Sequence, residues 1–243
     1  MALPALMLDY VLRAAEDLGG GRLCSAGYPD LLVHRPQLES LFGPERAGRI
    51  PIREDSAEIL RWHGVASVFE GVFEARSAFG EAGLEMDVLD VVASRGGEII
   101  VDLNHPLPPD FGRRYDIVLD TGTCEHCFNI GTAAMNLAGL VRAQGYLVQA
   151  LPLNSFNHGF YNVNPTWFHD FYAGNGFRIE LLVGVTNIVQ DPQFFELPAH
   201  ARFGAVPENS VAVMVARRVD ERPLGIPVQH KYRFNPTLRN GDS

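Results

Sequence analysis

Cysteine is scarce in this chain of 243 residues, which contains only Cys24, Cys124 and Cys127. An odd, low number of cysteines is typical of proteins that fold in a reducing compartment, and it argues against a framework of disulfides. The first 20 residues also carry no basic cluster ahead of their apolar positions, as a secretory leader would. We therefore expect a cytoplasmic protein.

Long apolar runs and an excess of positive charge are missing too. The sequence has no uncharged apolar stretch of about 18 residues, so no membrane span is expected. The formal net charge is −9, and Lys and Arg form no stripe of the kind that binds nucleic acid. These absences argue against membrane and nucleic-acid partners and favour a small-molecule substrate.

The signatures of several enzyme classes are absent as well. We find no G-x-S-x-G of serine hydrolases, no P-loop and no H-E-x-x-H of zinc proteases. What is present is the composition of a globular protein, with 47% hydrophobic and 20% charged residues. Such a chain has enough apolar side chains to bury a core.

Periodic apolar patterns indicate both helices and strands. Helical spacing predicts a helix within residues 1–20, a long one from Ser56, as its N-cap, to about Gly80, and further helices over 129–143 and from Pro165 to about Gly174. Short apolar runs bounded by turn residues suit strands that helices bury on both faces. The seven predicted strands cover residues 21–27, 86–92, 98–104, 115–122, 145–152, 177–185 and 210–219.

The order of these elements predicts the fold class. Helices alternate with most of the strands, which predicts an α/β fold with a parallel, doubly wound sheet. The last two strands follow each other without a helix, which predicts an antiparallel last strand. Binding sites in such sheets lie at the carboxyl ends of the strands, near the point where the strand order reverses. No repeat or linker interrupts the pattern, so we expect a single domain over 1–243.

Residues 186–209 are too long for a simple turn between the last two strands, and Phe194, Phe195 and Phe203 make them partly apolar. Long ordered loops are often binding loops. We expect this loop to cover the substrate pocket or to dock a partner chain, either a partner subunit or a second copy in a homodimer. Residues 223–243 are expected to form a polar tail.

Three motifs between Asp102 and Phe177 resemble those of a family of bacterial class I S-adenosylmethionine (SAM)-dependent methyltransferases. DLNHPLP resembles D-L-N-x-P-L-P, GTCEHCFN resembles G-T-x-E-H-x-F-N, and HGFYNVNPT resembles H-G-F-Y-x-x-x-P-T. The resemblance covers roughly a third of the chain. It implies a Rossmann-like, seven-stranded fold with helices on both faces and SAM as cofactor. It also implies methyl transfer to an oxygen or nitrogen of a small molecule, in bacterial secondary metabolism.

The first loop departs from the class pattern. Most methyltransferases carry G-x-G-x-G after the first strand, whereas here Gly27 stands alone and is followed by Tyr28. Glycine at this turn lets the backbone approach a cofactor, so both residues are candidate cofactor contacts. The reduced motif supports one alternative, a SAM-independent enzyme that closes a ring by intramolecular displacement in natural-product biosynthesis. A non-catalytic partner subunit is a second alternative, against which His126, His158 and Tyr161 argue.

Further candidate cofactor residues follow the second, third and fourth strands. Asp90 ends the second strand, beside Val91, where an acid accepts hydrogen bonds from ribose hydroxyls in nucleotide-binding folds. A solvated acid at the strand end is the alternative. The resemblance implies that the corner formed by Asp102, Leu103 and Asn104 meets the adenine. The same residues also suit an Asx-turn into Pro106.

Thr121 and Gly122 follow the fourth strand, at the expected junction of cofactor and substrate. Glycine at this position allows a ligand to approach the backbone. A plain turn between strand and helix is the alternative interpretation.

Four side chains after the fourth and fifth strands are candidate catalytic residues: Glu125, His126, His158 and Tyr161. These strands are neighbours in this fold, so their loops should converge over one pocket. A histidine titrates near neutral pH and can remove a proton from an acceptor. We predict His158 as the general base, because the adjacent Gly159 leaves room for a ligand, with His126 as the reserve.

Each of these residues also has a structural interpretation. Glu125 suits the start of a helix, and His126 suits capping or packing. His158 also suits holding a loop by hydrogen bonds, although we favour catalysis or substrate contact. Cys124 and Cys127 form C-x-x-C, but a structural zinc site needs four ligands and no second pair exists. We therefore expect buried, reduced cysteines and no metal.

Overall fold

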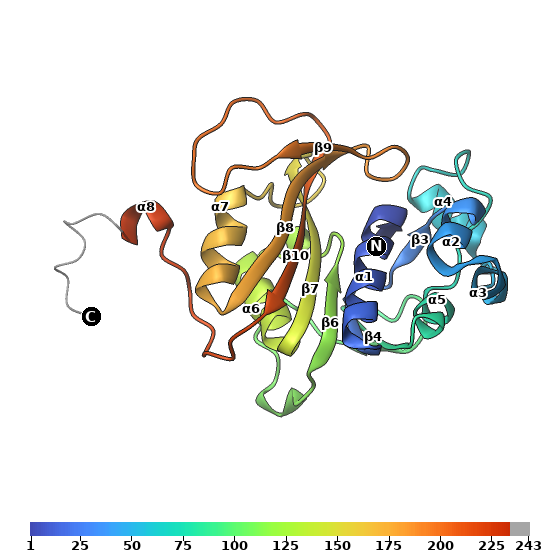
Figure 1. The fold of residues 1–243 in the computed structure, drawn as a ribbon, viewed down its shortest axis with the longest axis horizontal. Helices are drawn as coiled ribbons and strands as arrows, with labels where there is room; N and C mark the ends of the chain where they lie inside the picture. The colour runs from blue at the N-terminus through green and yellow to red at the C-terminus, as the bar shows by residue number, and fades with distance from the viewer. Residues whose placement is uncertain (234–243) are drawn as a thin grey trace.

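The structure is a computed structural model that describes residues 1–233. An eight-stranded sheet lies at the centre of the fold (Figure 1). A separate pair, β1 (Ala2–Pro4) and β3 (Asp30–Leu32), lies beside it. The strand order in the sheet is β5 (Glu98–Ile100), β4 (Leu84–Asp90), β2 (Gly21–Ala26), β6 (Tyr115–Asp120), β7 (Val141–Asn154), β10 (Ser210–Arg218), β8 (Phe177–Thr186) and β9 (Gln193–Glu196).

The pairing of these strands confirms the predicted α/β fold class. The strands from β5 to β7 are parallel neighbours, and β10 is antiparallel to both β7 and β8. The order runs outward from β2 in one direction and from β6 in the other. All seven predicted strands form, and the last is antiparallel as expected. The eighth strand of this sheet, β9, lies within the loop 186–209, antiparallel to β8, and neither it nor the separate pair β1 and β3 was predicted.

Helices cover both faces of the sheet (Figure 1). One side carries α1 (Ala5–Leu18), α2 (Arg35–Phe42), α3 (Pro44–Arg49) and α5 (Ala75–Glu81), while α4 (Ser56–Trp62) packs with Leu32 of β3 in a separate cluster. The other side carries α6 (Ile130–Leu140) and α7 (Pro165–Phe168), which a π-helical turn, η3 (His169–Ala173), continues. Short 3-10 turns occur at η1 (Pro109–Phe111) and η2 (Cys124–His126), and α8 (His230–Arg233) is the last described helix.

Alternating side chains of the central strands divide between two cores. On β6, Ile117 and Leu119 are fully buried with α1, whereas Val118 is fully buried with α6. On β7, Val148 joins the first core and Leu147 joins the second. Successive side chains of a strand point to opposite faces, and burying each of them stabilises the fold by about 1.5–3 kcal/mol. This explains why the strands read as unbroken apolar runs in the sequence.

The predicted helix from Ser56 to about Gly80 is wrong, because two short helices form there instead. The first, α4, ends before Gly64, whose φ of +68° belongs to the left-handed region that stops a helix. Ser56 is not the N-cap, a position that Asp55 occupies. The hydroxyl of Ser56 instead accepts a hydrogen bond from the Val72 N–H at 3.0 Å, which folds the segment back on itself.

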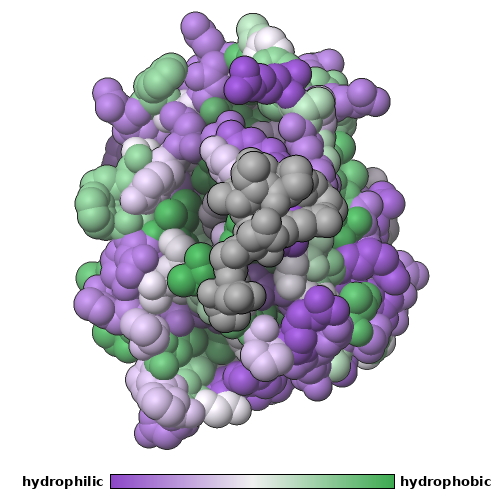
Figure 2. Space-filling view, turned by 90° about the vertical axis from the view of Figure 1, so that its left-hand side faces the viewer, coloured by the Kyte–Doolittle hydropathy of each residue, from purple (hydrophilic) through white to green (hydrophobic). Residues whose placement is uncertain are grey.

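The other expected segments form with small shifts. The N-terminal helix stops at Gly19, whose φ is +74°. The predicted helix 129–143 is shorter, since the chain enters β7 at Val141. In the predicted tail, α8 forms within 223–233, and residues 234–243 lie outside the described chain. Over residues 1–233, no helix is long and apolar enough to cross a membrane. The face turned to the viewer in Figure 2 is mixed, with hydrophobic residues in separate patches.

Candidate functional site

A cavity of about 590 Å³ lies at the carboxyl ends of the parallel strands. Segments after β2, β4, β5, β6 and β7 form its walls, and this is where the strand order reverses between β2 and β6. The lining residues are Met1, Ala2, Gly27, Trp62, His63, Leu89, Asp90, Val91, Val101, Asp102, Leu103, Asn104, Gly122, Thr123, His126, Cys127 and His158.

Most of the predicted cofactor residues meet in this cavity, although they come from four separate loops. The lining includes Gly27, Asp90, Val91, Asp102, Leu103, Asn104 and Gly122. Parallel strands end at the same edge of the sheet, so the residues that follow them are brought together. These residues therefore remain the candidate cofactor contacts.

Gly27 occupies a position that favours glycine. Its φ is +81°, and its N–H donates to the Leu89 carbonyl at 2.7 Å. A Cβ at this position would lie 3.3 Å from Thr123 Oγ1, tighter than ordinary van der Waals contact. The loop after β2 thus passes close to the loop after β6. The single glycine of the first loop makes this close approach easier.

The carboxylates of the cavity differ in how they are held. Asp90 Oδ1 accepts from the Val92 N–H at 3.3 Å. Asp102 Oδ1 accepts from both the backbone and the side-chain amide of Asn104, at 2.9 and 2.8 Å, which is the expected Asx-turn. These hydrogen bonds lower the pKa of Asp102. Asn104 Oδ1 in turn accepts from the Asn129 N–H at 2.9 Å, which ties this corner to the start of α6.

Two predicted cofactor residues are outside the lining that the structure describes. Tyr28 is buried at 4% exposure, and its hydroxyl donates to Glu74. Thr121 Oγ1 donates to the Ala2 carbonyl at 2.8 Å, so it holds the segment of β1. Their cofactor roles stay predictions, but both side chains are engaged in structural hydrogen bonds.

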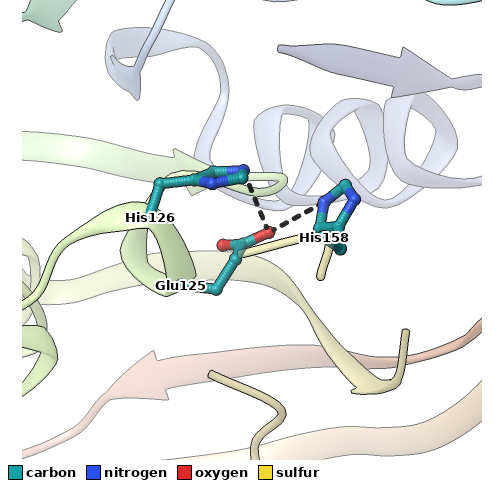
Figure 3. Close-up of side chains that lie close together, drawn as sticks. All are labelled: Glu125, His126 and His158. Atoms are coloured by element: carbon teal, nitrogen blue, oxygen red, sulfur yellow. Dashed lines mark ion pairs between the residues drawn. The ribbon is translucent and has the colours of Figure 1, made fainter. Parts of the chain in front are cut away.

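Glu125, His126 and His158 form a cluster at the rim of the cavity (Figure 3). Glu125 Oε1 lies 3.5 Å from His158 Nε2 and 3.9 Å from His126 Nε2. The two histidine rings are 5.2 Å apart. The Phe160 N–H donates to the Glu125 carbonyl at 2.8 Å and joins the two loops. The loops after β6 and β7 therefore converge, as the strand order predicts.

The carboxylate of this cluster is buried, whereas its histidines are open to the cavity. The Glu125 side chain is 1% exposed, against 49% for His126 and 56% for His158. The hydrogen bond to Glu125 raises the pKa of His158. Asp120, the last residue of β6, is fully buried. Its carboxylate accepts hydrogen bonds from Gln149 Nε2 and from the Thr123 N–H. Burial, followed by the charge of Glu125, raises the pKa of Asp120.

Two glycines leave space for the buried carboxylate. A Cβ at Gly122 would lie 3.1 Å from Glu125 Oε1, and one at Gly159 would lie 2.9 Å from Glu125 Cγ. Gly159 therefore accommodates Glu125 rather than a ligand. This corrects the reason for which the sequence favoured His158, although it does not test the role of that histidine.

Tyr161 supports the rim of the site. Its hydroxyl donates to the Phe128 carbonyl at 2.7 Å, and it is not among the described lining residues of the cavity. Phe128 packs edge-to-face on Phe160, with ring centres 5.5 Å apart, and the two are 72% and 63% exposed. The arrangement holds an exposed aromatic pair on the two loops that carry the cluster.

Comparison with known proteins finds no matching family model and no matching curated protein. Among solved structures, TehB from Haemophilus influenzae has a TM-score of 0.45 at 9% identity, over 86% of this chain and 61% of that one. This chain thus spans less than two thirds of TehB. The N-methyltransferase NodS from Bradyrhizobium japonicum, in complex with S-adenosylhomocysteine, has a TM-score of 0.43 at 9% identity, over 88% and 86%.

A third similar structure is the 1,6-didemethyltoxoflavin-N1-methyltransferase of Burkholderia thailandensis with bound 1,6-didemethyltoxoflavin and S-adenosylhomocysteine. Its TM-score is 0.43 at 16% identity, over 89% of this chain and 88% of that one.

Sequence reasoning missed Trp62 and His63, which both line the cavity. Trp62 is the last residue of α4 and His63 is its C-cap, where the sequence predicts the middle of a helix. His63 Nε2 lies 2.9 Å from Asp30 Oδ2, while Trp62 is 84% exposed. No local pattern marks either residue, because they reach the cavity through the break between α4 and α5. The cysteines, in contrast, are buried and unpaired as expected, and Cys127 also lines the cavity.

Proposed function

We propose that this chain binds SAM in the cavity at the strand ends and transfers its methyl group to an oxygen or nitrogen of a small molecule. The observation that carries the proposal is the meeting of residues from three separate family-like motifs around one cavity, at the point where the strand order reverses. The volume of about 590 Å³ falls within the range of small-molecule sites, roughly 300–1,000 Å³.

The cofactor roles follow from the loops. We assign Asp90 to the ribose hydroxyls, because it ends the strand next to β2. The corner of Asp102, Leu103 and Asn104 is assigned to the adenine. Gly27 and Gly122 border the remaining part of the cavity, where we assign the methionine portion of SAM.

The reaction breaks the bond between the methyl carbon and sulfur and forms a bond from the acceptor atom to that carbon. The electron pair of the broken bond stays on sulfur, so the sulfonium becomes the thioether of S-adenosylhomocysteine. The acceptor loses a proton, and the protein must hold it in line with the carbon–sulfur bond. His126 and His158, at the rim of the cavity, are assigned to the acceptor side.

The acceptor is expected to be apolar or aromatic on one face. Phe128 and Phe160 present exposed rings on the loops that carry the histidines. Aromatic rings favour contact with flat, apolar ligands. Together with the net charge of −9, this supports a small molecule over nucleic acid. We assign the reaction to the cytoplasm and, following the motif resemblance, to bacterial secondary metabolism.

Calorimetry with SAM and S-adenosylhomocysteine tests the proposal, with Asp90→Ala as the variant and Glu85→Ala, at the exposed start of the same strand, as the matched control. Loss of a hydrogen bond to a charged group should weaken SAM binding by about 1–3 kcal/mol in Asp90→Ala, or about 5- to 150-fold. Glu85→Ala should bind as the parent does. A parent chain that binds neither compound at millimolar concentration would refute the proposal and favour the SAM-independent ring-closing enzyme.

A further inference from the structure

The cluster at the rim of the cavity contains the side chains of a metal site. Glu125 offers a carboxylate oxygen, and His126 and His158 each offer an imidazole nitrogen. Two histidines and one carboxylate are a common ligand set of catalytic zinc and of non-haem iron, in which further positions stay open to substrate. The residues come from two loops that the Phe160–Glu125 hydrogen bond holds together.

The geometry of the three side chains suits a single ion. The two Nε2 atoms approach the same oxygen, Glu125 Oε1, at 3.9 and 3.5 Å, and the three ligand atoms lie within 4.8 Å of one another (Figure 3). Metal–ligand bonds of about 2.0–2.2 Å place tetrahedral ligands roughly 3.3 Å apart. Both histidines are about half exposed, so small side-chain rotations bring the ligands to that spacing.

A second observation points to a missing cation. Glu125 is 1% exposed, and its Oε2 is a buried atom without a hydrogen-bond partner among residues 1–233. Its ion pairs in the described chain are with the two histidines, which are charged only when protonated. Burying a carboxylate without a compensating partner is costly. A divalent ion beside Oε1 supplies the countercharge and leaves the histidines neutral, as metal ligands are.

We propose that Glu125, His126 and His158 bind one divalent transition-metal ion, whose open coordination positions face the cavity. The nitrogen-rich ligand set favours zinc, cobalt or ferrous iron over magnesium and calcium, which prefer oxygen ligands. Both histidines line the cavity, so a ligand within it reaches the ion directly.

The ion would act on the acceptor, a role that rests on the proposed methyl transfer. An acceptor hydroxyl bound to the ion releases its proton to solvent more readily, because the positive charge stabilises the oxyanion. The oxygen then attacks the methyl carbon while the electrons of the carbon–sulfur bond stay with sulfur. His126 and His158 hold the ion in this arrangement, and the proton does not pass through His158.

The test titrates Co²⁺ alone into the full chain, with any affinity tag removed and resident metal stripped by a chelator. Visible absorption of the bound ion and calorimetry report binding without any methyl acceptor. We expect a Co²⁺ site that Zn²⁺ displaces and Mg²⁺ does not. His126→Ala and His158→Ala should each weaken it by at least about tenfold. The matched control is His105→Ala, an exposed histidine outside the cluster, which should bind Co²⁺ as the parent does.

Glu125→Gln completes the series and should also lose Co²⁺ affinity, with circular dichroism confirming that this buried variant folds. The double variant His126→Ala/His158→Ala alters exposed side chains and keeps the test valid if Glu125→Gln does not fold. Unchanged Co²⁺ binding in the double variant, or no binding by the parent, would overturn the site. SAM calorimetry separates the two proposals, since a chain that binds Co²⁺ but not SAM retains the metal site and loses the proposed function.

Discussion

Glycines decide the local geometry of the site at the scale of single residues. Gly27 allows the loops after β2 and β6 to approach each other, whereas Gly122 and Gly159 make room for the side chain of Glu125. In the sequence these glycines look alike, as positions where a ligand approaches the backbone. The structure separates them, because the atom that a Cβ would meet differs from one glycine to the next.

Replacing Gly27 by alanine should lower the free energy of unfolding by about 1–2 kcal/mol. The φ of +81° is unfavourable for a residue with a Cβ, and the new methyl group would also crowd Thr123. Urea unfolding measures the change. The control is Gly48→Ala in α3, where a Cβ meets no atom of the described chain within 4 Å and should be neutral or stabilising. Equal stability of Gly27→Ala and the parent would mean that the loop relaxes at no cost.

At the scale of elements, the loop 186–209 is more structured than its composition suggests. Its middle forms β9 at the edge of the sheet, and Val189 packs near Leu32 and Ile59. Thr166 Oγ1 donates to the Ala199 carbonyl at 3.1 Å, which fastens the loop to α7. The second half borders a separate cavity of about 730 Å³ beside Trp167. No loop residue is among the lining of the strand-end cavity within residues 1–233.

Deleting Asp191 to Ala201 should therefore separate cofactor binding from turnover. We expect SAM affinity to stay near that of the parent, because no residue of 191–201 is among the described lining of the cavity. Turnover should be lost, because we still predict that the loop serves the acceptor or a partner chain. Calorimetry and a methyl-transfer assay measure the two effects. Turnover at the parent rate would show that the loop is not needed for methyl transfer.

At the scale of the whole molecule, one carboxylate links three strands of the sheet. Asp87 on β4 accepts hydrogen bonds from Arg22 on β2 at 3.0 Å and from Tyr115 on β6 at 2.8 Å, and Arg113 adds a contact at 2.8 Å. Burial would raise the pKa of Asp87, but the hydrogen bonds from Tyr115 and Arg113 and the nearby arginine charges lower it overall.

This lowered pKa predicts a pH-dependent contribution to stability. The group binds its proton less readily in the folded chain, so it stabilises the fold above its unfolded pKa of about 3.9. That contribution is lost as the pH falls through the folded pKa. Asp87→Asn should cost about 1–3 kcal/mol at pH 7.

Urea unfolding at pH 7 and near pH 3 checks this expectation. The difference between Asp87→Asn and the parent should shrink in acid. Asp9→Asn removes an exposed pair with Arg13 and should change little at either pH. A cost for Asp87→Asn that is the same at both pH values would show that its charge is not responsible.

The amino-acid sequence by itself determined the strands, the α/β class and the loops that meet at the site. Successive side chains of a strand point to opposite faces of the sheet. A strand that is buried on both faces is therefore a continuous apolar run in the sequence. The parallel order of these strands then brings the residues after them to one edge, where Asp90, Asp102 and Gly122 line one cavity.

Contacts between distant segments were decided by the tertiary structure alone. The helix predicted from Ser56 breaks because Ser56 bonds Val72 and the apolar side chains pack against β3 instead of along one helix face. Glu125 and His158 lie 33 positions apart in the sequence, and their pairing depends on how two loops fold over β6 and β7. The periodicity of a sequence indicates that a side chain is buried, but it does not indicate which residues surround that side chain. The buried carboxylate and its two histidines could therefore be recognised as one cluster only in the tertiary structure.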